Sequence, residues 1–300
     1  MAPGASGTQA APRFPNASGS AKLLLENVKF EHTIFALPFA YIGMVLAADG
    51  VPTLWQVVWI TVAMAAARTF AMSLNRLIDR EIDRRNPRTS GRPLPSGRLT
   101  STQVGIAAAI SLVVLLVAAA LLTPLALLLS PIAVAFMVGY HYLKRFTWLC
   151  HFVLGITDAA ATMGAWIAIT NSMDPPAYLL GLAVATWIGG FDIIYACQDV
   201  AFDRANRLHS IPARFGIRTA LWVARVCHLV TVLALIATGV FLGLGPLYYL
   251  GCLIAAGLLA YENSLVSPTD LSRINLAFFN MNGYLAVAVF VCTLGAVLVD

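Results

Sequence analysis

The sequence predicts an all-α polytopic membrane protein in which about nine transmembrane helices form one bundle. Two features of the composition support this prediction: 59% of the 300 residues are hydrophobic, and only 11% are charged. Soluble domains are about half apolar and about one quarter charged. The third feature is the pattern, because long apolar runs alternate with short segments rich in glycine, proline or charge. The chain therefore has the character of a protein that a lipid bilayer surrounds.

Two regions follow from the same pattern. Residues 1–21 are rich in Ala, Gly, Pro and Ser and contain no apolar signal-peptide stretch, so we expect a disordered N-terminal tail. Residues 22–300 form one transmembrane domain. The five cysteines stand singly in apolar segments, without the spacing of a disulfide framework or a zinc site. The expected helices cover residues 30–48, 54–81, 102–122, 124–142, 148–170, 177–202, 217–242, 245–262 and 273–299.

Lysine and arginine occur in alternate turns between these helices, and therefore on one side of the membrane. The turns "ADGVPT", "LLTPLA", "NSMDPPA" and "GLGP" contain neither residue. Because lysine and arginine concentrate in cytoplasmic loops, we predict an integral protein of a bacterial cytoplasmic membrane with its N-terminus inside and its C-terminus outside. The net charge of +5 is then mainly a topology signal, and we expect no nucleic-acid partner. The basic positions on the expected cytoplasmic side are Lys22, Lys29, Arg76, Arg80, Arg84, Arg85, Arg88, Arg92, Arg98, Lys144, Arg145, Arg204, Arg207, Arg214, Arg218 and Arg273.

Carboxylates gather at the expected cytoplasmic end of the second helix, in "NRLIDREIDRR". Asn75, Asp79 and Asp83 are spaced by four residues, so on one continuous helix they drift by only about 40° per step and share a face. Arg68 precedes Asn75 by seven residues and lies within about 20° of the same face, two turns deeper. We therefore expect one polar stripe along this helix.

The sixth helix repeats the arrangement in "FDIIYACQDVAFDR". Asp192, Asp199 and Asp203 are spaced by seven and four residues and also share one face. Charged groups at membrane depth are costly unless they face a cavity and find partners. Carboxylate and amide oxygens are the ligands that Mg²⁺ prefers, and nearby arginines bind phosphate oxygens. A juxtamembrane salt-bridge network is the alternative, but the second stripe favours a metal and diphosphate pocket above an apolar bundle, suited to a polyprenyl diphosphate.

The two motifs resemble those of the UbiA family of intramembrane aromatic prenyltransferases. "NRLIDREID" is similar to the family's first motif, "DIIYACQDVAFD" to its second, and "RPLPSG" and "YHYLKRFT" to segments beside them. "KFEHTIFALPFA" and "LHSIPARFG" resemble the 4-hydroxybenzoate polyprenyltransferase-like branch of the futalosine route to menaquinone. One departure stands out: ubiquinone-type members carry a pattern resembling R-x-D-K-P where this chain has Lys29, Glu31, His32 and Thr33.

The resemblance implies a central cavity open to the cytoplasm, in which a pair of Mg²⁺ ions bridges the motifs and the diphosphate of a polyprenyl donor. The other partner is an aromatic acid of the 4-hydroxybenzoate or hydroxynaphthoate type, and no obligate protein partner is expected. Asp192 is the candidate for orienting the acceptor or receiving its ring proton, with a structural partnership to Arg68 as the alternative. The implied metal ligands are Asn75, Asp79, Asp83, Asp199 and Asp203, and the implied diphosphate or substrate contacts are Arg68, Tyr140, Lys144, Arg145 and Tyr195.

Some assignments stay open on sequence alone. Asp158, in the middle of the fifth helix, fits either acceptor contact or a structural hydrogen bond. His32 and His209 fit either acceptor contact or solvation at the interface. A membrane terpene cyclase would use similar aspartate-rich motifs, and a transporter would also carry intramembrane charges. The clustering of the carboxylates at one membrane side disfavours the transporter.

Overall fold

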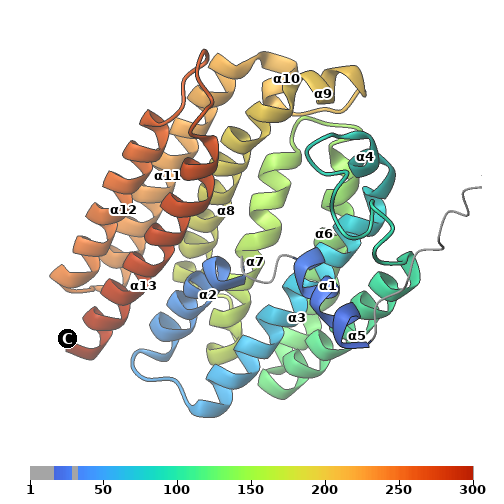
Figure 1. Ribbon diagram of the computed structural model, residues 1–300. Coiled ribbons are helices and arrows are strands. Elements are labelled where there is room, and N and C mark those ends of the chain that lie inside the picture. The colour runs from blue at the N-terminus through green and yellow to red at the C-terminus, as the bar shows by residue number, and fades with distance from the viewer. Residues whose placement is uncertain (1–16, 29–32, 300) are drawn as a thin grey trace, which may run out of the picture.

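The computed structural model describes residues 17–28 and 33–299, and this part of the chain is helical, with turns and one isolated bridge between Ser267 and Asp270 (Figure 1). The prediction of an all-helical fold is confirmed. The elements are α1 (Ala17–Val28), α2 (Thr33–Ala48), α3 (Leu54–Ile78), α4 (Arg80–Arg85), α5 (Ser101–Leu122), α6 (Pro124–Leu143), α7 (Cys150–Thr170), α8 (Pro175–Ala196), the 3₁₀ turn η2 (Cys197–Asp199), α9 (Val200–Ala205), α10 (Ile211–Phe215), α11 (Ile217–Leu242), α12 (Pro246–Ser264), the π-helix η3 (Leu276–Met281) and α13 (Asn282–Val299).

Local sequence signals set several of these boundaries. Thr53 and Gln56 form a capping box at the start of α3, and Thr100 with Gln103 does the same for α5. Proline stands in the first turn of α6, α8 and α12, where its missing N–H costs nothing. Gly243, in the left-handed conformation, ends α11. Short polar turns therefore separate helices whose interiors are apolar.

The long helices pack side by side in one bundle (Figure 1). α3 contacts α5, α7 contacts α6, α8 and α2, and α8, α11, α12 and α13 follow one another back to α2. Small residues allow the closest approaches: a Cβ on Gly155 of α7 would collide with the Ala185 carbonyl of α8, and one on Gly43 of α2 with the Thr162 carbonyl of α7. α7 is thus held tightly against two neighbours, which gives the site below a rigid support.

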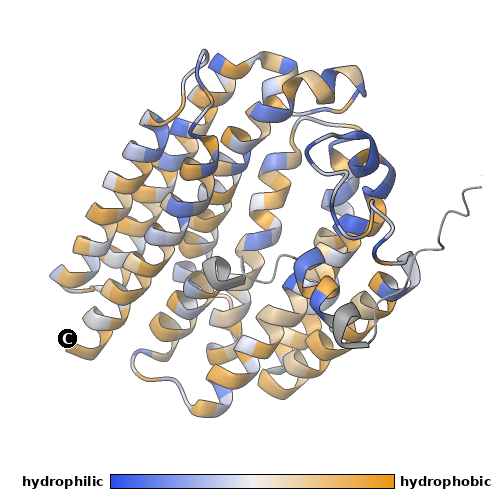
Figure 2. Ribbon diagram, viewed as in Figure 1, coloured by the Kyte–Doolittle hydropathy of each residue, from blue (hydrophilic) through white to orange (hydrophobic). Residues whose placement is uncertain are grey.

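The outer face of the bundle is apolar. Ile106, Ile110 and Val113 of α5 and Leu229 and Leu233 of α11 are all more than half exposed. Helices that are apolar on both their packed and their exposed faces are typical of a lipid environment. Figure 2 shows this hydrophobic belt and the largest hydrophilic area at the end of the bundle that carries α4.

Seven helices in the described residues are long and apolar enough to cross a bilayer. The expected number was about nine. α2 has only 16 residues, and α12 ends in Tyr261, Glu262, Asn263 and Ser264, which lower its hydropathy. The fold is therefore that of an integral membrane protein, while the count of nine spans stays a prediction.

Two expected helices are not continuous. α3 stops at Ile78, and Asp79, at φ −95° and ψ 8°, separates it from α4. α8 stops at Ala196, and Asp199 has almost the same conformation, φ −97° and ψ 4°, between η2 and α9. The predicted helices 54–81 and 177–202 were wrong in this respect. Helical spacing continues through one non-helical residue at Asp79 and through one 3₁₀ turn at Cys197–Asp199, so neither break is visible in the sequence.

The N-terminal boundary also differs from the expected one. α1 begins at Ala17, so it includes residues 17–21 of the predicted tail. Leu23 and Leu24 of α1 pack against Leu94 and Leu99 of the loop before α5, which explains why a helix forms here. Residues 1–16 and the 29–32 segment with Lys29, Glu31 and His32 lie outside the described residues.

Candidate functional site

The two aspartate-rich motifs lie at the same end of the bundle. The first occupies the break between α3 and α4, and the second occupies the break between α8 and α9 (Figure 1). The loop 86–100 and the turn after α6 complete this polar end. The structure thus brings together carboxylates that are more than a hundred residues apart in the chain.

The first motif is held by cations on both sides. Asn75 donates a hydrogen bond from Nδ2 to Asp79 Oδ2 over 3.2 Å, and its Oδ1 accepts one from Arg76 over 2.9 Å. Arg145 Nη2 lies 3.1 Å from Asp79 Oδ1 and 2.7 Å from the Ile78 carbonyl, which the helix break leaves available. The break at Asp79 therefore creates the place where Arg145 binds.

Asp83 is buried and pairs with two arginines. Arg92 Nη1 lies 2.8 Å from Asp83 Oδ2, and Arg76 Nη1 lies 3.8 Å from the same oxygen. Thr89 donates to the Asp83 carbonyl over 2.9 Å and so ties the loop 86–100 to α4. The predicted basic loop is therefore folded over the first motif.

The second motif is held in the same way. Arg88 donates from Nε and Nη2 to the two carboxylate oxygens of Asp199 over 3.1 Å and 2.7 Å, and Asn86 adds a longer bond of 3.4 Å. Asp203 lies 3.6 Å from Lys144 Nζ and accepts a hydrogen bond from Ser210 over 3.0 Å. Residues from the first-motif loop thus reach the second motif directly.

The carboxylates and cations at the two helix breaks shift the pKa values of one another. Burial raises the pKa of Asp79 above its ordinary value, and the hydrogen bond and charge of Arg145 oppose this rise only in part. Burial alone would lower the pKa of Lys144, but the carboxylates of Asp203, Asp79 and Asp199 together outweigh it, so the pKa is raised and Lys144 stays a cation. The same balance, with Asp199 as the partner, raises the pKa of Arg88. The site therefore presents fixed positive charge beside its carboxylates.

Asp192 belongs to a different contact. Its Oδ2 lies 2.6 Å from His151 Nδ1, on α7, and within the described residues it forms no ion pair with Arg68. The alternative partnership of Asp192 with Arg68 is therefore wrong. Arg68 interacts electrostatically with Asp158 and Tyr140, and its Nε is buried without a hydrogen-bond partner in the described part of the chain. His209 binds the Lys144 carbonyl through its backbone N–H over 2.6 Å.

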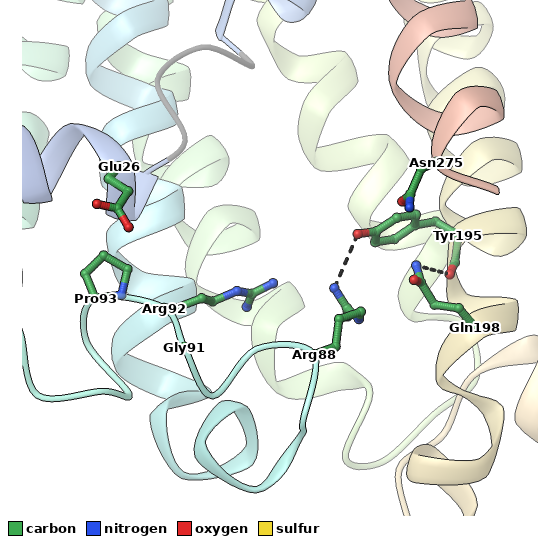
Figure 3. A pocket seen from close by; sticks show the side chains of 8 residues that line it. All are labelled: Glu26, Arg88, Gly91, Arg92, Pro93, Tyr195, Gln198 and Asn275. Carbon is green, nitrogen blue, oxygen red and sulfur yellow. Dashed lines mark hydrogen bonds between the residues drawn. The ribbon is translucent and has the colours of Figure 1, made fainter. Parts of the chain in front are cut away.

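A pocket of about 610 Å³ opens beside the paired motifs. Arg88 and Arg92 point into it from the loop 86–100, and Tyr195 faces them from α8, with its hydroxyl 3.3 Å from Arg88 Nη1 (Figure 3). The Tyr195 ring also stacks on Phe278 of η3, with centroids 4.1 Å apart. The pocket is lined by Glu26, Arg88, Gly91, Arg92, Pro93, Tyr195, Gln198 and Asn275. It combines cations with an aromatic wall.

The donor chemistry of the motifs fits Mg²⁺. Asn75, Asp79, Asp83, Asp199 and Asp203 supply hard oxygens, and Asp203 Oδ1 is buried without a hydrogen-bond partner in the described residues. The same residues do not form a ready cluster: the described chain has no group of three or more acidic, histidine or cysteine residues close enough to hold one ion. The ion pairs with Arg88, Arg92, Arg145 and Lys144 separate the carboxylates. A metal and an anion arriving together would satisfy both sets of charges.

Sequence reasoning missed several contacts of this site. Arg88 and Arg92 were predicted as part of a basic cytoplasmic loop but not as the ion-pair partners of Asp199 and Asp83. Asn86 and Ser210 were not singled out, and His151 was given no role. Arginine recurs every four residues at Arg84, Arg88 and Arg92, and this regular spacing was the available signal that the loop contributes cations to the site. No local pattern indicates that His151 faces Asp192, since the two residues lie on different helices.

The fold and the site define an α-helical membrane protein with paired aspartate-rich motifs and facing cations at one end of its bundle. Residues 36–284 match the model of the UbiA prenyltransferase family, and the chain belongs to this family and is an enzyme, a prenyltransferase. The predicted resemblance is confirmed. Among curated relatives, the 4-hydroxybenzoate octaprenyltransferase of Aliivibrio salmonicida is 31% identical over 257 residues, 86% of this chain and 90% of that protein.

Solved structures agree with this placement. The apo structure of a UbiA homolog from Aeropyrum pernix K1 has a TM-score of 0.80 and 32% identity, and the match covers 87% of this chain and 96% of that one. A UbiA homolog from Archaeoglobus fulgidus bound to GPP and Mg²⁺ has a TM-score of 0.65 at 19% identity, over 89% of this chain and 99% of that one. The second comparison shows a shared fold.

Proposed function

We propose that this chain transfers a polyprenyl group from a polyprenyl diphosphate to an aromatic acid of the 4-hydroxybenzoate or hydroxynaphthoate type, with Mg²⁺, in quinone biosynthesis. The single observation that carries the proposal is the convergence of both aspartate motifs, at Asp79 and Asp199, on cations suited to a diphosphate. The relatives named 4-hydroxybenzoate octaprenyltransferase support the aromatic acceptor. Menaquinone or ubiquinone as the end product remains part of the proposal.

The first step is cleavage of the allylic C–O bond, whose electron pair leaves with the diphosphate. Asn75, Asp79, Asp83, Asp199 and Asp203 would hold a pair of Mg²⁺ ions, which supply positive charge to neutralise the leaving group. Arg88, Lys144 and Arg145 bind diphosphate oxygens when they exchange their carboxylate partners for the substrate. Arg68, Tyr140 and Tyr195 contact the substrate below and beside these groups. The chain's own cations thus change partners without leaving the site.

The second step joins the allylic carbon to the aromatic ring. The π electrons of the ring form the new C–C bond, and the ring proton then leaves so that aromaticity returns. Asp192 is the proposed proton acceptor or orienting group, and its side chain is 27% exposed although it lies within the bundle, so it borders an internal space. The apolar helices around it exclude water from the allylic cation. Asp158 is proposed to face the same space, since it interacts electrostatically with both Arg68 and Asp192.

We also infer that the site opens to the cytoplasm of a bacterial cell. The end with α4 and α9 is the most hydrophilic part of the bundle (Figure 2), and α4, the loop 86–100 and α9 supply many of the arginines, as expected for cytoplasmic loops. The C-terminus lies at the opposite end of the bundle (Figure 1). Labelling of single cysteines placed at both ends in intact cells tests this orientation.

The reaction is tested with purified protein in detergent, a polyprenyl diphosphate, Mg²⁺ and a panel of aromatic acids. We expect a prenylated arene and free diphosphate, and we expect Asp79→Ala and Asp199→Ala to lower turnover by at least about a hundredfold. Asp270→Ala, in an exposed loop, is the control and should be unaffected. Diphosphate with only a cyclic hydrocarbon would identify a terpene cyclase instead, and no consumption of the donor would contradict the proposal.

A further inference from the structure

His151 bridges two parts of the site that the sequence keeps apart. It lies in the first turn of α7 and is only 3% exposed. Its Nδ1 is 2.6 Å from Asp192 Oδ2, on α8, and its Nε2 accepts a hydrogen bond from the backbone N–H of Ile211 over 3.3 Å. Ile211 is the first residue of α10. One imidazole therefore connects the acceptor-side carboxylate with the segment that enters α10.

The directions of these two bonds are those of a neutral ring. An amide N–H can only donate, so Nε2 must carry a lone pair and no proton. In the neutral ring the proton then sits on Nδ1, which donates to the Asp192 carboxylate. A protonated ring would carry a hydrogen on Nε2 as well and would lose the bond from Ile211. The geometry thus describes a neutral bridge with one donor and one acceptor.

The segment on the far side of this bridge holds the second motif. Ser210, next to Ile211, donates to Asp203 Oδ2 over 3.0 Å and caps α10 by accepting from the Ala213 N–H over 3.3 Å. The backbone N–H of His209 donates to the Lys144 carbonyl over 2.6 Å. Asp203 and Lys144 also form an ion pair of 3.6 Å. Movement of residues 209–211 would therefore move both members of that pair.

We propose that His151 is a positioning residue. It acts as a neutral hydrogen-bond bridge and fixes the positions of the Asp192 and Asp203 carboxylates relative to each other. This inference rests on the proposed function, because it assigns Asp192 to the aromatic acceptor and Asp203 to the metal and diphosphate. His151 fixes Oδ2 of Asp192 and leaves Oδ1 for the acceptor. Through Ile211 and Ser210 it also fixes Asp203. Groups that orient ligands in this way change affinity or activity by about 10- to 100-fold when they are removed.

Two substitutions of His151 distinguish a hydrogen-bond bridge from a proton carrier. Glutamine offers one amide donor and one carbonyl acceptor at about the reach of the imidazole, but it does not titrate. Leucine keeps the volume and offers neither group. A bridge survives His151→Gln and fails in His151→Leu, whereas a proton carrier fails in both.

The experiment measures kcat and KM for the aromatic acid, and the Mg²⁺ concentration for half-maximal activity, in His151→Gln and His151→Leu. We expect the glutamine variant to stay within about threefold of the unmodified protein, and the leucine variant to lose about 10- to 100-fold in kcat/KM and to need more Mg²⁺. The matched control is His228→Leu, since His228 is also 3% exposed but its Nδ1 bonds to Asn263 on α12 and not to a motif carboxylate. Its kinetics should not change.

A second readout does not depend on turnover. Amide hydrogen exchange of residues 206–213 should accelerate in His151→Leu and stay unchanged in His151→Gln and His228→Leu. If the leucine variant does not fold, His151→Asn replaces it, because the shorter amide cannot reach both partners. Unchanged exchange and kinetics in the leucine or asparagine variant overturn the proposal, and so does a glutamine variant as impaired as the leucine one. An unmodified protein that makes no prenylated arene contradicts the proposed function alone, because the exchange result still tests the bridge.

Discussion

Arg88 donates two parallel hydrogen bonds to Asp199, from Nε to Oδ1 over 3.1 Å and from Nη2 to Oδ2 over 2.7 Å. The two residues are 111 positions apart, so this pair closes the loop of the first motif onto the second. Charge-assisted bidentate pairs are strong and directional. The same guanidinium lies 5.4 Å from the centroid of the Tyr195 ring, at the wall of the pocket. Arg88 is therefore placed to exchange its Asp199 partner for the diphosphate of a substrate.

Replacing Arg88 with lysine tests this geometry. Lysine keeps the charge but cannot form the two parallel bonds, so we expect kcat/KM for the polyprenyl diphosphate to fall by about 10- to 100-fold, the equivalent of about 1.4 to 2.8 kcal/mol. Steady-state kinetics with varied donor concentration measure the change. Arg225→Lys, on the exposed side of α11, is the control. Equal kinetics for the two variants would contradict a bidentate role for Arg88.

Tyr195 offers a test of the aromatic wall. Its ring stacks on Phe278 and its hydroxyl accepts a bond from Arg88 Nη1 over 3.3 Å. Tyr195→Phe keeps the ring and loses one exposed hydrogen bond, so we expect less than about a tenfold loss of kcat/KM. Tyr195→Leu also removes the stacking and cation–π contacts, each worth about 1 kcal/mol, and should lose more. An equal loss of kcat/KM in the two variants would assign the hydroxyl, and not the ring, the main role.

Much of the fold could be predicted from the sequence because lipid imposes a simple rule on it. An apolar run of helical length must be a helix in a bilayer, since its backbone has no other partner there. The motifs at Asp79 and Asp199 could also be placed at one end of the bundle, because basic residues occupy every second turn and therefore one side of the membrane. These inferences need only the order of residues along the chain.

The remaining features depend on contacts that the order of residues does not contain. The break at Asp79 follows helical spacing on both sides, and it matters because Arg145 binds the freed Ile78 carbonyl over 2.7 Å. His151 pairs with Asp192, a residue 41 positions away on the next helix. Carboxylate stripes suggested ligands facing a metal, whereas the folded chain first satisfies each carboxylate with a nearby cation. These ion pairs depend on the folded arrangement of charges, which the order of residues does not reveal.

Asp174 gives a prediction for pH. It lies in the turn before α8, where its Oδ2 accepts bonds from Ser172 Oγ over 2.6 Å and Trp166 Nε1 over 2.9 Å, and these bonds hold its pKa below the ordinary value of 3.8. A lowered carboxyl pKa in the folded state stabilises the fold above 3.8, and this stabilisation is lost as the pH falls through the lower folded pKa. We expect the thermal midpoint to drop in that range and Asp174→Asn to show a smaller drop. Parallel melting curves for both proteins across acidic pH would contradict the assignment.

Asn282 connects the lipid-embedded core to the site. Its Oδ1 accepts a bond from Trp187 Nε1 over 2.6 Å, and its Nδ2 donates to the Phe278 carbonyl over 2.9 Å and more weakly to Glu262 over 3.4 Å. Phe278 belongs to the π-helix η3, whose loosened ladder needs such side-chain support. Asn282→Leu would leave the Trp187 N–H buried without its acceptor, which costs about 1 to 3 kcal/mol.

We therefore expect Asn282→Leu to lower the thermal midpoint and also to reduce turnover, because Phe278 carries the ring that stacks on Tyr195. Thr293→Val is the matched control on the same helix: Thr293 is fully buried, but among the described residues its hydroxyl bonds only to the Val289 carbonyl of its own helix. If the two variants lose the same stability and both keep the turnover of the unmodified protein, the π-helix does not transmit the core contact to Tyr195. A loss of activity confined to Asn282→Leu, measured below both midpoints, would show that it does.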